Sequence, residues 1–380
     1  MAKAKRGSTV KKGLKFFNFG EAGTWKSTFA LDFMKMKGEN GKPLRVLYID
    51  CEAGSVDNYL ESLEEQGINL DNLLLVYTTS YSEVEEWAQK AMQEETLYIE
   101  DDEGNLEEVF DADGNPFIAD VIVVDGITVI SDNVKFAAIN VSEKRAKLKA
   151  KSQDKTATEQ FVAESTAGLE FKDHDKIKMK GKNLLRSLIT GTDKYVVVTS
   201  REKTKKQMVD VDGKMQLVEV GKVPDTWDGV EYEFFTVLRH FEDDMGQIKA
   251  QVMRKDRTQV YAQNVVIDDP SPLLWQDVID KNKGKKSNVV GNSMSDSIKK
   301  DEDLLSESMT NKKEKAQEEE ALPEVAVDSL RDEIGKLISA LTPLKKKSLG
   351  AKVKASGLDI DFNQIEAISD LEKFLKLIKE

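Results

Sequence analysis

Short apolar runs alternate with longer amphipathic stretches along most of the chain. The apolar runs, which predict strands, are residues 14–19, 45–49, 73–77, 121–124 and 195–199. The amphipathic stretches, which predict helices, are residues 29–37, 56–66, 82–93 and 176–189, and Ser82 is the expected N-cap of the third. Strands that alternate with helices are typical of a mainly parallel sheet with helices on both sides. We therefore predict an α/β domain over residues 13–280.

Two segments interrupt this alternation. Residues 97–118 contain two acidic turn signals, at 102–105 and 111–115, and predict an inserted acidic hairpin. The second signal also resembles the start of a calcium-binding loop. The bidentate glutamate of such a loop is missing at the required distance, so we favour a turn. A second hairpin is predicted over residues 206–220, around Asp212-Gly213.

The pattern changes after Trp275. Residues 281–324 are polar and charged with few large apolar side chains, and such a segment cannot bury enough surface to order itself. Apolar periodicity returns at 327–341 and 365–378, which predicts a small helical C-terminal module over residues 325–380. Residues 1–12 form a basic N-terminal arm. We therefore expect four parts: this arm, the α/β domain, a disordered linker and the helical module.

Composition narrows the classes of protein. The formal net charge of −13 argues against a surface coated in positive charge for nucleic acid, but it leaves room for a local basic groove. The single cysteine, Cys51, excludes an intramolecular disulfide, and His174 and His240 are too far apart in sequence to suggest a zinc site. No apolar run approaches the roughly 20 residues of a membrane span. We expect a soluble cytoplasmic protein, in the host cytoplasm if a phage encodes it.

The most informative motif lies between the first predicted strand and the first predicted helix. It reads Gly20-Glu21-Ala22-Gly23-Thr24-Trp25-Lys26-Ser27-Thr28. Strand, glycine loop, Lys-Ser and helix is the order of a phosphate-binding loop, in which backbone N–H groups and the helix N-terminus attract an anion. Lys26 would reach the β- and γ-phosphates of ATP, and the Ser27 hydroxyl would hold Mg²⁺. Trp25 replaces the second glycine of the pattern and lacks glycine's freedom at positive φ. The alternative is a strand–turn–helix with a chance Lys-Ser pair.

Two further predicted strands end in carboxylates. The run 46–49 leads into Asp50 and Glu52, at the sheet edge where a nucleotide binds in α/β proteins. Glu52 could orient or deprotonate the water that attacks the γ-phosphate, whereas the alternative is that Asp50 and Glu52 cap the next helix. The run 121–124 ends in Asp125, the pattern of a Walker B aspartate that contacts Mg²⁺.

Residues 48–52, 67–74 and 121–125 together resemble the ATPase core of RecA-family recombinases. The span 13–275 resembles the phage-type RecA-like AAA nucleotide-binding proteins, some of which anneal single strands, and residues 197–203, 224–226 and 232–234 fit that resemblance. It implies a RecA-like P-loop NTPase that hydrolyses ATP with Mg²⁺ and self-associates into a ring or filament. The implied site residues are Gly20, Gly23, Lys26 and Ser27 in the phosphate loop, Glu52 as catalytic glutamate, Asp125 as Walker B, and Ser200 and Arg201 as γ-phosphate sensor at the tip of the last core strand.

The resemblance also implies a partner. RecA-like proteins bind single strands through loops that follow the Walker B and sensor strands, and the corresponding stretches here are basic. They contain Lys144, Arg145 and Lys147, then Lys203, Lys205 and Lys206, which could track the phosphate backbone of single-stranded DNA. The alternative is a solvated helix face with flexible loops. Lys255 and Arg257, after a predicted strand at 247–253, would reach the ATP of a neighbouring subunit, unless they form a simple turn.

Three functions compete on this reading. The first is an ATPase that acts on single-stranded DNA in recombination, annealing or replication. The second is a nucleotide-dependent interaction protein with weak or no turnover, which recruits a protein partner through its C-terminal helices. The third is a small-molecule P-loop kinase, which we disfavour because no arginine-rich lid is evident.

Overall fold

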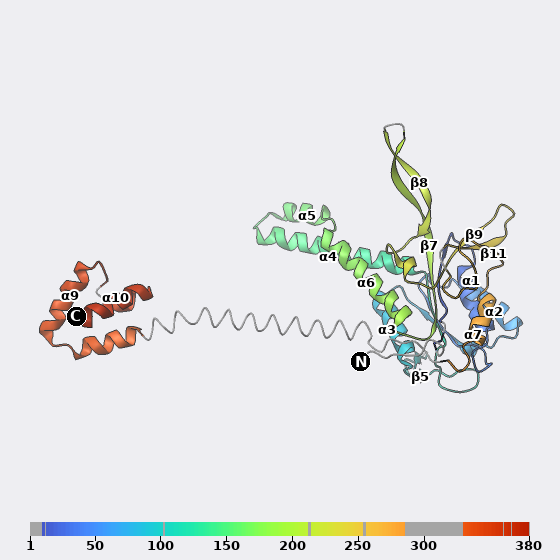
Figure 1. Ribbon diagram of the computed structural model, residues 1–380, viewed down its shortest axis with the longest axis horizontal. Coiled ribbons are helices and arrows are strands. Elements are labelled where there is room, and N and C mark those ends of the chain that lie inside the picture. Colours follow the sequence, from blue (N-terminus) through green and yellow to red (C-terminus); the bar gives the residue numbers. More distant parts are fainter. Residues whose placement is uncertain are drawn as a thin grey trace. The chain divides into compact units, whose positions relative to one another are not determined.

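The protein is described by a computed structural model that divides into two compact units, Met1–Met294 and Ser295–Glu380 (Figure 1). The structure describes residues 10–11, 13–101, 103–211, 214–253, 256–285, 330–359, 361–365 and 367–379. Most of the predicted linker and most of the N-terminal arm therefore lie outside the described residues, as does the Asp212-Gly213 turn. Each unit is considered by itself.

A large sheet forms the centre of the first unit. Its strands lie in the order β11-β10-β9-β1-β7-β6-β2-β3, and β8 pairs with an extension of β7. The strands are β1 (Lys15–Gly20), β2 (Val46–Asp50), β3 (Leu73–Tyr77), β6 (Val121–Asp125), β7 (Tyr195–Val211), β8 (Lys214–Pro224), β9 (Thr236–Glu242), β10 (Ile248–Val252) and β11 (Val266–Asp268). All pairs from β9 through β1, β7, β6 and β2 to β3 are parallel, and those of β10 are antiparallel. The predicted mainly parallel sheet is confirmed.

Most helices of this unit flank the sheet, while the fifth packs against the fourth. The helices are α1 (Lys26–Leu31) with the 3₁₀ turn η2 (Asp32–Lys35), α2 (Asp57–Glu65), α3 (Tyr81–Gln93), α4 (Ile127–Ser152), α5 (Ala157–Ser165), α6 (Phe171–Thr190) and α7 (Gln276–Asp280), with 3₁₀ turns η3 (Leu70–Asn72), η4 (Val230–Tyr232) and η5 (Pro272–Trp275). The N-cap of α3 is Ser80, whose side chain accepts from the Glu83 amide. The prediction of Ser82 at that position is wrong, because the helix begins one residue earlier, at Tyr81.

Two apolar cores lie on the two faces of the sheet. Ile122 and Val124 belong to a cluster that includes side chains of α3, α4 and α6. Val121 and Val123, the alternate residues of the same strand, belong to a cluster with side chains of α1, α2 and α7. Successive strand residues point to opposite faces, so a strand buried on both sides reads as a continuous apolar run.

Two hairpins depart from the central sheet. The strand β7 has 17 residues: its first part lies in the core, and its second part pairs with β8 from Glu202↔Pro224 to Val211↔Lys214. Figure 1 shows this β7–β8 hairpin projecting beyond the sheet. Within the predicted insertion, β4 (Tyr98–Glu100) and β5 (Leu106–Glu108) pair in a separate two-stranded sheet.

The second unit is helical. It contains a helix at 330–340, α9 (Pro343–Ala355), η6 (Phe362–Gln364) and α10 (Ile368–Lys379). Its apolar core is formed by Ile334, Leu349, Val353, Ile365, Leu371 and Phe374. In the part of the chain that the structure describes, no helix is long and apolar enough to cross a membrane.

Candidate functional site

The register of the parallel strands brings the predicted site residues to one edge of the sheet. Gly20 at the end of β1 pairs with Arg201 of β7 on one side and with His240 of β9 on the other. Asp50 at the end of β2 pairs with Asp125 at the end of β6. The carboxyl ends of parallel strands share an edge, and α/β proteins bind ligands there.

The phosphate loop runs from Gly20 at the end of β1 to Lys26 at the start of α1. A Cβ on Gly20 would lie 2.1 Å from the carbonyl oxygen of His240, so only glycine allows this approach. Gly23 has φ +78. Trp25 has φ 58 and ψ 28, the left-handed conformation, and its side chain is 48% exposed. Trp25 thus adopts the conformation that the missing glycine would supply, at a cost of about 1–2 kcal/mol.

Lys26 bends back over the loop. Its Nζ donates to the carbonyl oxygen of Glu21 at 2.5 Å and to Thr24 Oγ1 at 3.4 Å. Burial lowers the pKa of Lys26, and the carboxylates of Asp125 and Glu52 oppose that shift. The ammonium group therefore bonds to neutral oxygen atoms, while the carboxylates of Asp125, Glu52 and Glu202 lie within electrostatic range.

Asp125 accepts hydrogen bonds from four hydroxyl groups. Its Oδ2 accepts from Ser27 Oγ at 2.8 Å, Tyr48 OH at 2.6 Å and Ser55 Oγ at 2.9 Å, and its Oδ1 accepts from Thr199 Oγ1. The carboxylate is only 2% exposed. Burial, aided by Asp125, raises the pKa of Tyr48, so the phenol remains a donor. The two predicted metal ligands, Ser27 and Asp125, are thus in contact although 98 positions separate them.

The other three hydroxyl donors were not predicted. Tyr48 and Thr199 lie on the strands β2 and β7, inside apolar runs that were assigned only to the core. The available signal was alternation: Tyr48 shares a strand face with Asp50, and polar groups that interrupt apolar runs on one face point to a buried polar site.

Asp50 shapes the loop that follows β2. Its carboxylate accepts from the backbone N–H groups of Glu52 at 2.8 Å, Gly54 at 2.9 Å and Ser55 at 2.9 Å. The N-cap of the following helix α2 is Val56, and no side chain caps it. The alternative that Asp50 and Glu52 cap this helix is therefore wrong, and Asp50 instead fixes the position of Glu52.

Glu52 contacts the predicted sensor. Arg201 Nε donates to Glu52 Oε1 at 3.0 Å. A Cβ on Gly126 would lie 2.4 Å from Glu52 Cγ, so the glycine makes room for this side chain. The amide of Arg201 donates to Thr128 Oγ1 at 3.0 Å, and the hydroxyls of Thr128 and Ser200 lie 3.4 Å apart. Ser200 and Arg201 lie inside β7, where it leaves the core, and not at a strand tip.

An ion-pair cluster joins the β7–β8 hairpin to the phosphate loop. The Glu202 side chain is 2% exposed and accepts from Arg239 at 2.8 and 3.2 Å. Lys222 of β8 lies 3.5 Å from Glu202 and 3.8 Å from Glu21. Sequence reasoning missed this cluster, because it depends on the continuation of β7 into the hairpin.

His240 of β9 contacts the phosphate loop at two points. Its Nδ1 lies 3.2 Å from the carbonyl oxygen of Thr24, and a carbonyl only accepts, so Nδ1 carries the proton. Complete burial, followed by the charge of Lys26, lowers the pKa of His240 to about 3. A neutral histidine thus pairs through its backbone with Gly20 and through its ring with Thr24, at two points of the same loop.

The first predicted nucleic-acid cluster does not lie in a loop. Lys144, Arg145 and Lys147 belong to α4, because the helix begins directly after Gly126 at the end of the Walker B strand. Arg145 pairs with Asp173 at 3.0 Å, and Lys147 pairs with Glu164 at 2.8 Å. The expectation of a loop here is wrong.

The remaining predicted cations lie on the hairpin and near β10. Lys203, Lys205 and Lys206 are on β7, where Lys203 lies 3.2 Å from Asp225 and Lys206 lies 3.9 Å from Glu219. Lys255 is outside the described residues. Arg257 donates to the carbonyl oxygen of Tyr232 at 3.4 Å and lies over the Phe235 ring at 5.4 Å, both within its own chain.

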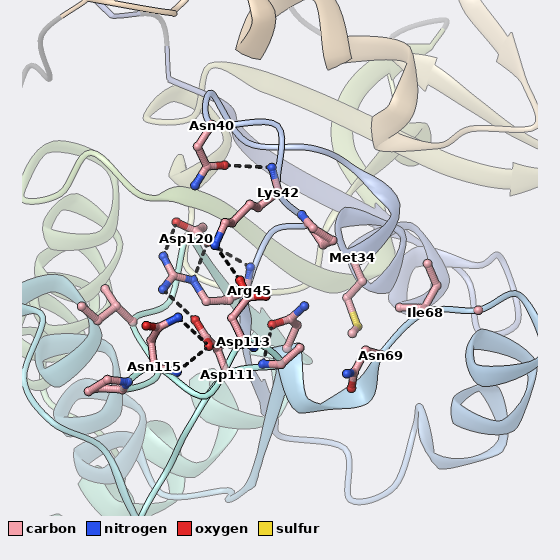
Figure 2. A pocket seen from close by; sticks show the side chains of 16 residues that line it. Met34, Asn40, Lys42, Arg45, Ile68, Asn69, Asp111, Asp113, Asn115 and Asp120 are labelled. Carbon is pink, nitrogen blue, oxygen red and sulfur yellow. Dashed lines mark hydrogen bonds and ion pairs between the residues drawn. The ribbon is translucent and has the colours of Figure 1, made fainter.

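A cavity of about 390 Å³ lies at the opposite edge of the sheet (Figure 2). Arg45, just before β2, donates from Nε to Asp120 Oδ2 at 2.9 Å and from Nη2 to Asp120 Oδ1 at 3.1 Å, and it reaches Asp111 at 3.4 Å. Lys42 pairs with Asp113 at 2.7 Å. The cations of this cavity thus contact carboxylates of the same chain.

The segment considered as a calcium loop lines this cavity. Asp111 Oδ1 accepts from the backbone N–H groups of Asp113 at 3.0 Å and Asn115 at 2.9 Å, which is a turn fixed by an aspartate. Within the described ranges, no group of three or more His, Cys, Asp or Glu side chains could hold a metal ion.

Known proteins offer little guidance. No protein-family model matches the chain, and no curated protein sequence matches it. Among solved structures, a KaiC-like protein from the hyperthermophilic archaeon Pyrococcus horikoshii OT3 is 13% identical, with a TM-score of 0.35 over 71% of this chain and 100% of its own. Similarity at this level says nothing about the activity of this chain.

Proposed function

We propose that the protein binds ATP with Mg²⁺ at the Gly20–Thr28 loop and hydrolyses it. The observation that carries this proposal is the 2.8 Å hydrogen bond between Ser27 Oγ and Asp125 Oδ2, directly beside Lys26. A strand-to-helix glycine loop, its lysine and hydroxyl, and a carboxylate at a neighbouring strand end are the parts of a P-loop NTPase site.

The oxygen groups present fit Mg²⁺. This ion prefers oxygen ligands and is held by one or two protein groups together with substrate phosphates and water, so a dense cluster of carboxylates is not required. Ser27 and Asp125 would hold it, and the hydroxyls of Tyr48 and Thr199 stabilise the negative charge of Asp125. Bound there, the ion would neutralise phosphate charge.

Each remaining group has a role. The loop amides and the α1 N-terminus would bind phosphate oxygens, and Lys26 would exchange its carbonyl contact with Glu21 for a phosphate. Glu52, placed by Asp50 and Gly126, would orient the attacking water and accept its proton. Arg201, beside Glu52, would contact the γ-phosphate as the sensor.

The proposal extends to single-stranded DNA, handled in recombination, annealing or replication by a self-associated ring or filament. The sequence resemblance supports this part. The basic residues Lys203, Lys205 and Lys206 lie on the β7–β8 hairpin. The base of this hairpin contacts the phosphate loop through Lys222 and Glu21, and this contact could couple nucleotide binding to DNA binding.

The test is ATP turnover with and without a single-stranded oligonucleotide. Glu52→Gln should retain ATP affinity and lose about 10²–10⁴-fold in turnover, because general-base catalysis contributes that much. Glu107→Gln, an exposed change on β5, is the matched control and should behave as wild type. Equal losses of binding and turnover would make Glu52 a structural residue. Turnover that DNA does not alter would remove the DNA part of the proposal.

The nucleotide-dependent interaction protein remains the second candidate. The separate apolar core of the C-terminal helices favours it, because a self-contained unit can recruit a protein partner. ATP binding without turnover in the wild-type chain would support this reading over the first.

A further inference from the structure

The helix α9 of the C-terminal unit is strongly basic. Its 13 residues contain five lysines and no acidic residue, in a chain whose formal net charge is −13. All five side chains are exposed: Lys345, Lys346, Lys347, Lys352 and Lys354. The sequence reading assigned this module a protein partner and took no account of this charge.

Several other cations of the protein pair with carboxylates. On α10 of the same unit, Lys373 pairs with Asp370 at 2.8 Å and Lys379 pairs with Glu333 at 3.0 Å. Arg145 and Lys203 of the first unit are likewise paired with carboxylates. Among the described residues, no carboxylate lies within ion-pair distance of the α9 lysines, and all five ammonium groups are on exposed side chains.

The lysines are arranged in rows along the helix. Lys345 and Lys352 are seven residues apart, as are Lys347 and Lys354, and two helical turns place the members of each pair about 10 Å apart on one face. Leu349 and Val353 occupy the buried face of the helix. The two rows of lysines therefore lie on either side of the solvent-facing surface of the helix, and the opposite face packs in the core of the unit.

The residues between the lysines are small. Ser348, Ala351 and Ala355 are exposed, and the described side chains of α9 include no exposed large apolar residue. Insertion into a lipid surface needs exposed apolar side chains, and protein interfaces depend on anchors such as Trp, Tyr and Arg. With only small residues between them, the rows of lysines can instead approach a polymer that carries regularly spaced negative charges.

We propose that α9 binds the phosphate backbone of nucleic acid without regard to sequence or bound nucleotide. Lysine acts as a point charge and lacks the planar fork with which arginine reads guanine, so it contacts phosphates and carries little base information. This surface belongs to the second unit, whereas the candidate ATP site and the lysines of the β7–β8 hairpin belong to the first, and the proposal does not depend on either.

The test is a salt titration of the full-length protein on a labelled oligonucleotide, single-stranded and duplex, without nucleotide. Lys345, Lys347 and Lys352 are replaced together by glutamine. Removal of three phosphate contacts should lower the log–log salt slope on single strands by about 2, so that between 50 and 200 mM salt the wild type loses about 18-fold more affinity than the variant. The matched control replaces Lys336, Lys373 and Lys379 by glutamine, with the same change of charge in the same unit.

The control variant should keep the wild-type slope, since two of its lysines are already paired. Equal slopes in all three proteins, or equal losses in both variants, would overturn the proposal. So would α9-dependent binding to anionic lipid vesicles with unchanged oligonucleotide binding. Far-ultraviolet circular dichroism checks that the variant remains helical. Lys26→Ala should retain the α9-dependent slope, so loss of ATPase function and loss of α9 binding are separately visible.

Discussion

The two edges of the central sheet both carry clusters of charged side chains, and β2 connects them. Before β2, Arg45 contacts Asp120 and Asp111 around the cavity of Figure 2. After β2, Asp50 fixes the Glu52 loop and opposes Asp125. The same types of residue thus meet at both ends of one strand.

The difference lies in how the charges are satisfied. Around the cavity at the amino edge, Arg45 and Lys42 contact carboxylates, and their pairs with Asp111 and Asp113 connect the sheet to the 97–118 insertion. At the carboxyl edge Lys26 bonds to neutral oxygens, and two non-glycine residues, Trp25 and Ala53, have positive φ. Strained backbone persists only where the surroundings enforce it and tends to gather at functional sites. Lys42 and Arg45 are thus held by carboxylates, whereas the Lys26 ammonium is held by neutral oxygen atoms that a phosphate can replace.

The strongest test of this contrast compares one lysine from each edge. Lys26→Ala should lower ATP turnover by about 10³–10⁵-fold, the range for a cation that stabilises transferring phosphoryl charge. Lys42→Ala should leave turnover unchanged, because this exposed lysine only pairs with Asp113. The measurement is steady-state ATP hydrolysis, with thermal unfolding to show that both variants fold. Wild-type turnover in Lys26→Ala would contradict the assignment of the active edge.

Arg45→Ala should produce the opposite pattern. It leaves Asp120 and Asp111 without their guanidinium partner, and the loss of such a charged hydrogen-bond group should lower the free energy of unfolding by about 2 kcal/mol. Urea unfolding measures this, and turnover per folded molecule should stay at the wild-type level. A fall in turnover without a fall in stability would show that the amino edge takes part in function.

The pH dependence of stability tests His240. Its folded pKa is about 3, whereas an unfolded histidine titrates near 6.5, so only the unfolded chain gains this proton as pH falls below 6.5. Stability should therefore drop by about 1.4 kcal/mol from pH 7.5 to 5.5. His240→Gln should lack this drop, and the other histidine, His174, is exposed and provides the control variant His174→Gln. An unchanged pH profile in His240→Gln would be inconsistent with a buried neutral histidine beneath the loop.

Trp25→Gly should have the smallest effect. Relief of about 1–2 kcal/mol of left-handed strain is largely offset by the greater freedom of glycine in the unfolded chain, about 0.5–1 kcal/mol. Because Trp25 already has φ 58, ATP affinity measured by calorimetry should change less than about threefold, well below the tenfold that corresponds to 1.4 kcal/mol. A tenfold gain in affinity would mean that the tryptophan impairs phosphate binding.

The features that could be predicted from the sequence are those that depend on residues close together along the chain. The phosphate loop needs only nine consecutive residues, and the parallel sheet follows from alternating apolar and amphipathic runs. Alternation places Tyr48 on the strand face of Asp50, but the contacts of Tyr48, Ser55 and Thr199 with Asp125 could not be predicted. They depend on which strands are neighbours and in what register.

The misplaced basic residues have a similar cause. Whether residues 127–152 continue as a loop or a helix depends on Gly126, which has φ +87 and starts α4 at once. The predicted hairpin at 206–220 is confirmed by the pairing of β7 with β8, but the apolar run 195–199 gave no sign that the core strand continues into it without a break.

The continuity of β7 has a structural consequence. The segment from Ser200 to Lys205 continues the core strand without a break, so the base of the hairpin is directly joined to Arg201 beside Glu52. The ladder with β8 shifts register between Lys205 and Lys206, and Gly221 opposite has φ +139. A bulge bends and twists a hairpin locally. The part of the hairpin before the bulge therefore stays aligned with the carboxyl edge of the sheet, whereas the ladder after the bulge can run in a different direction.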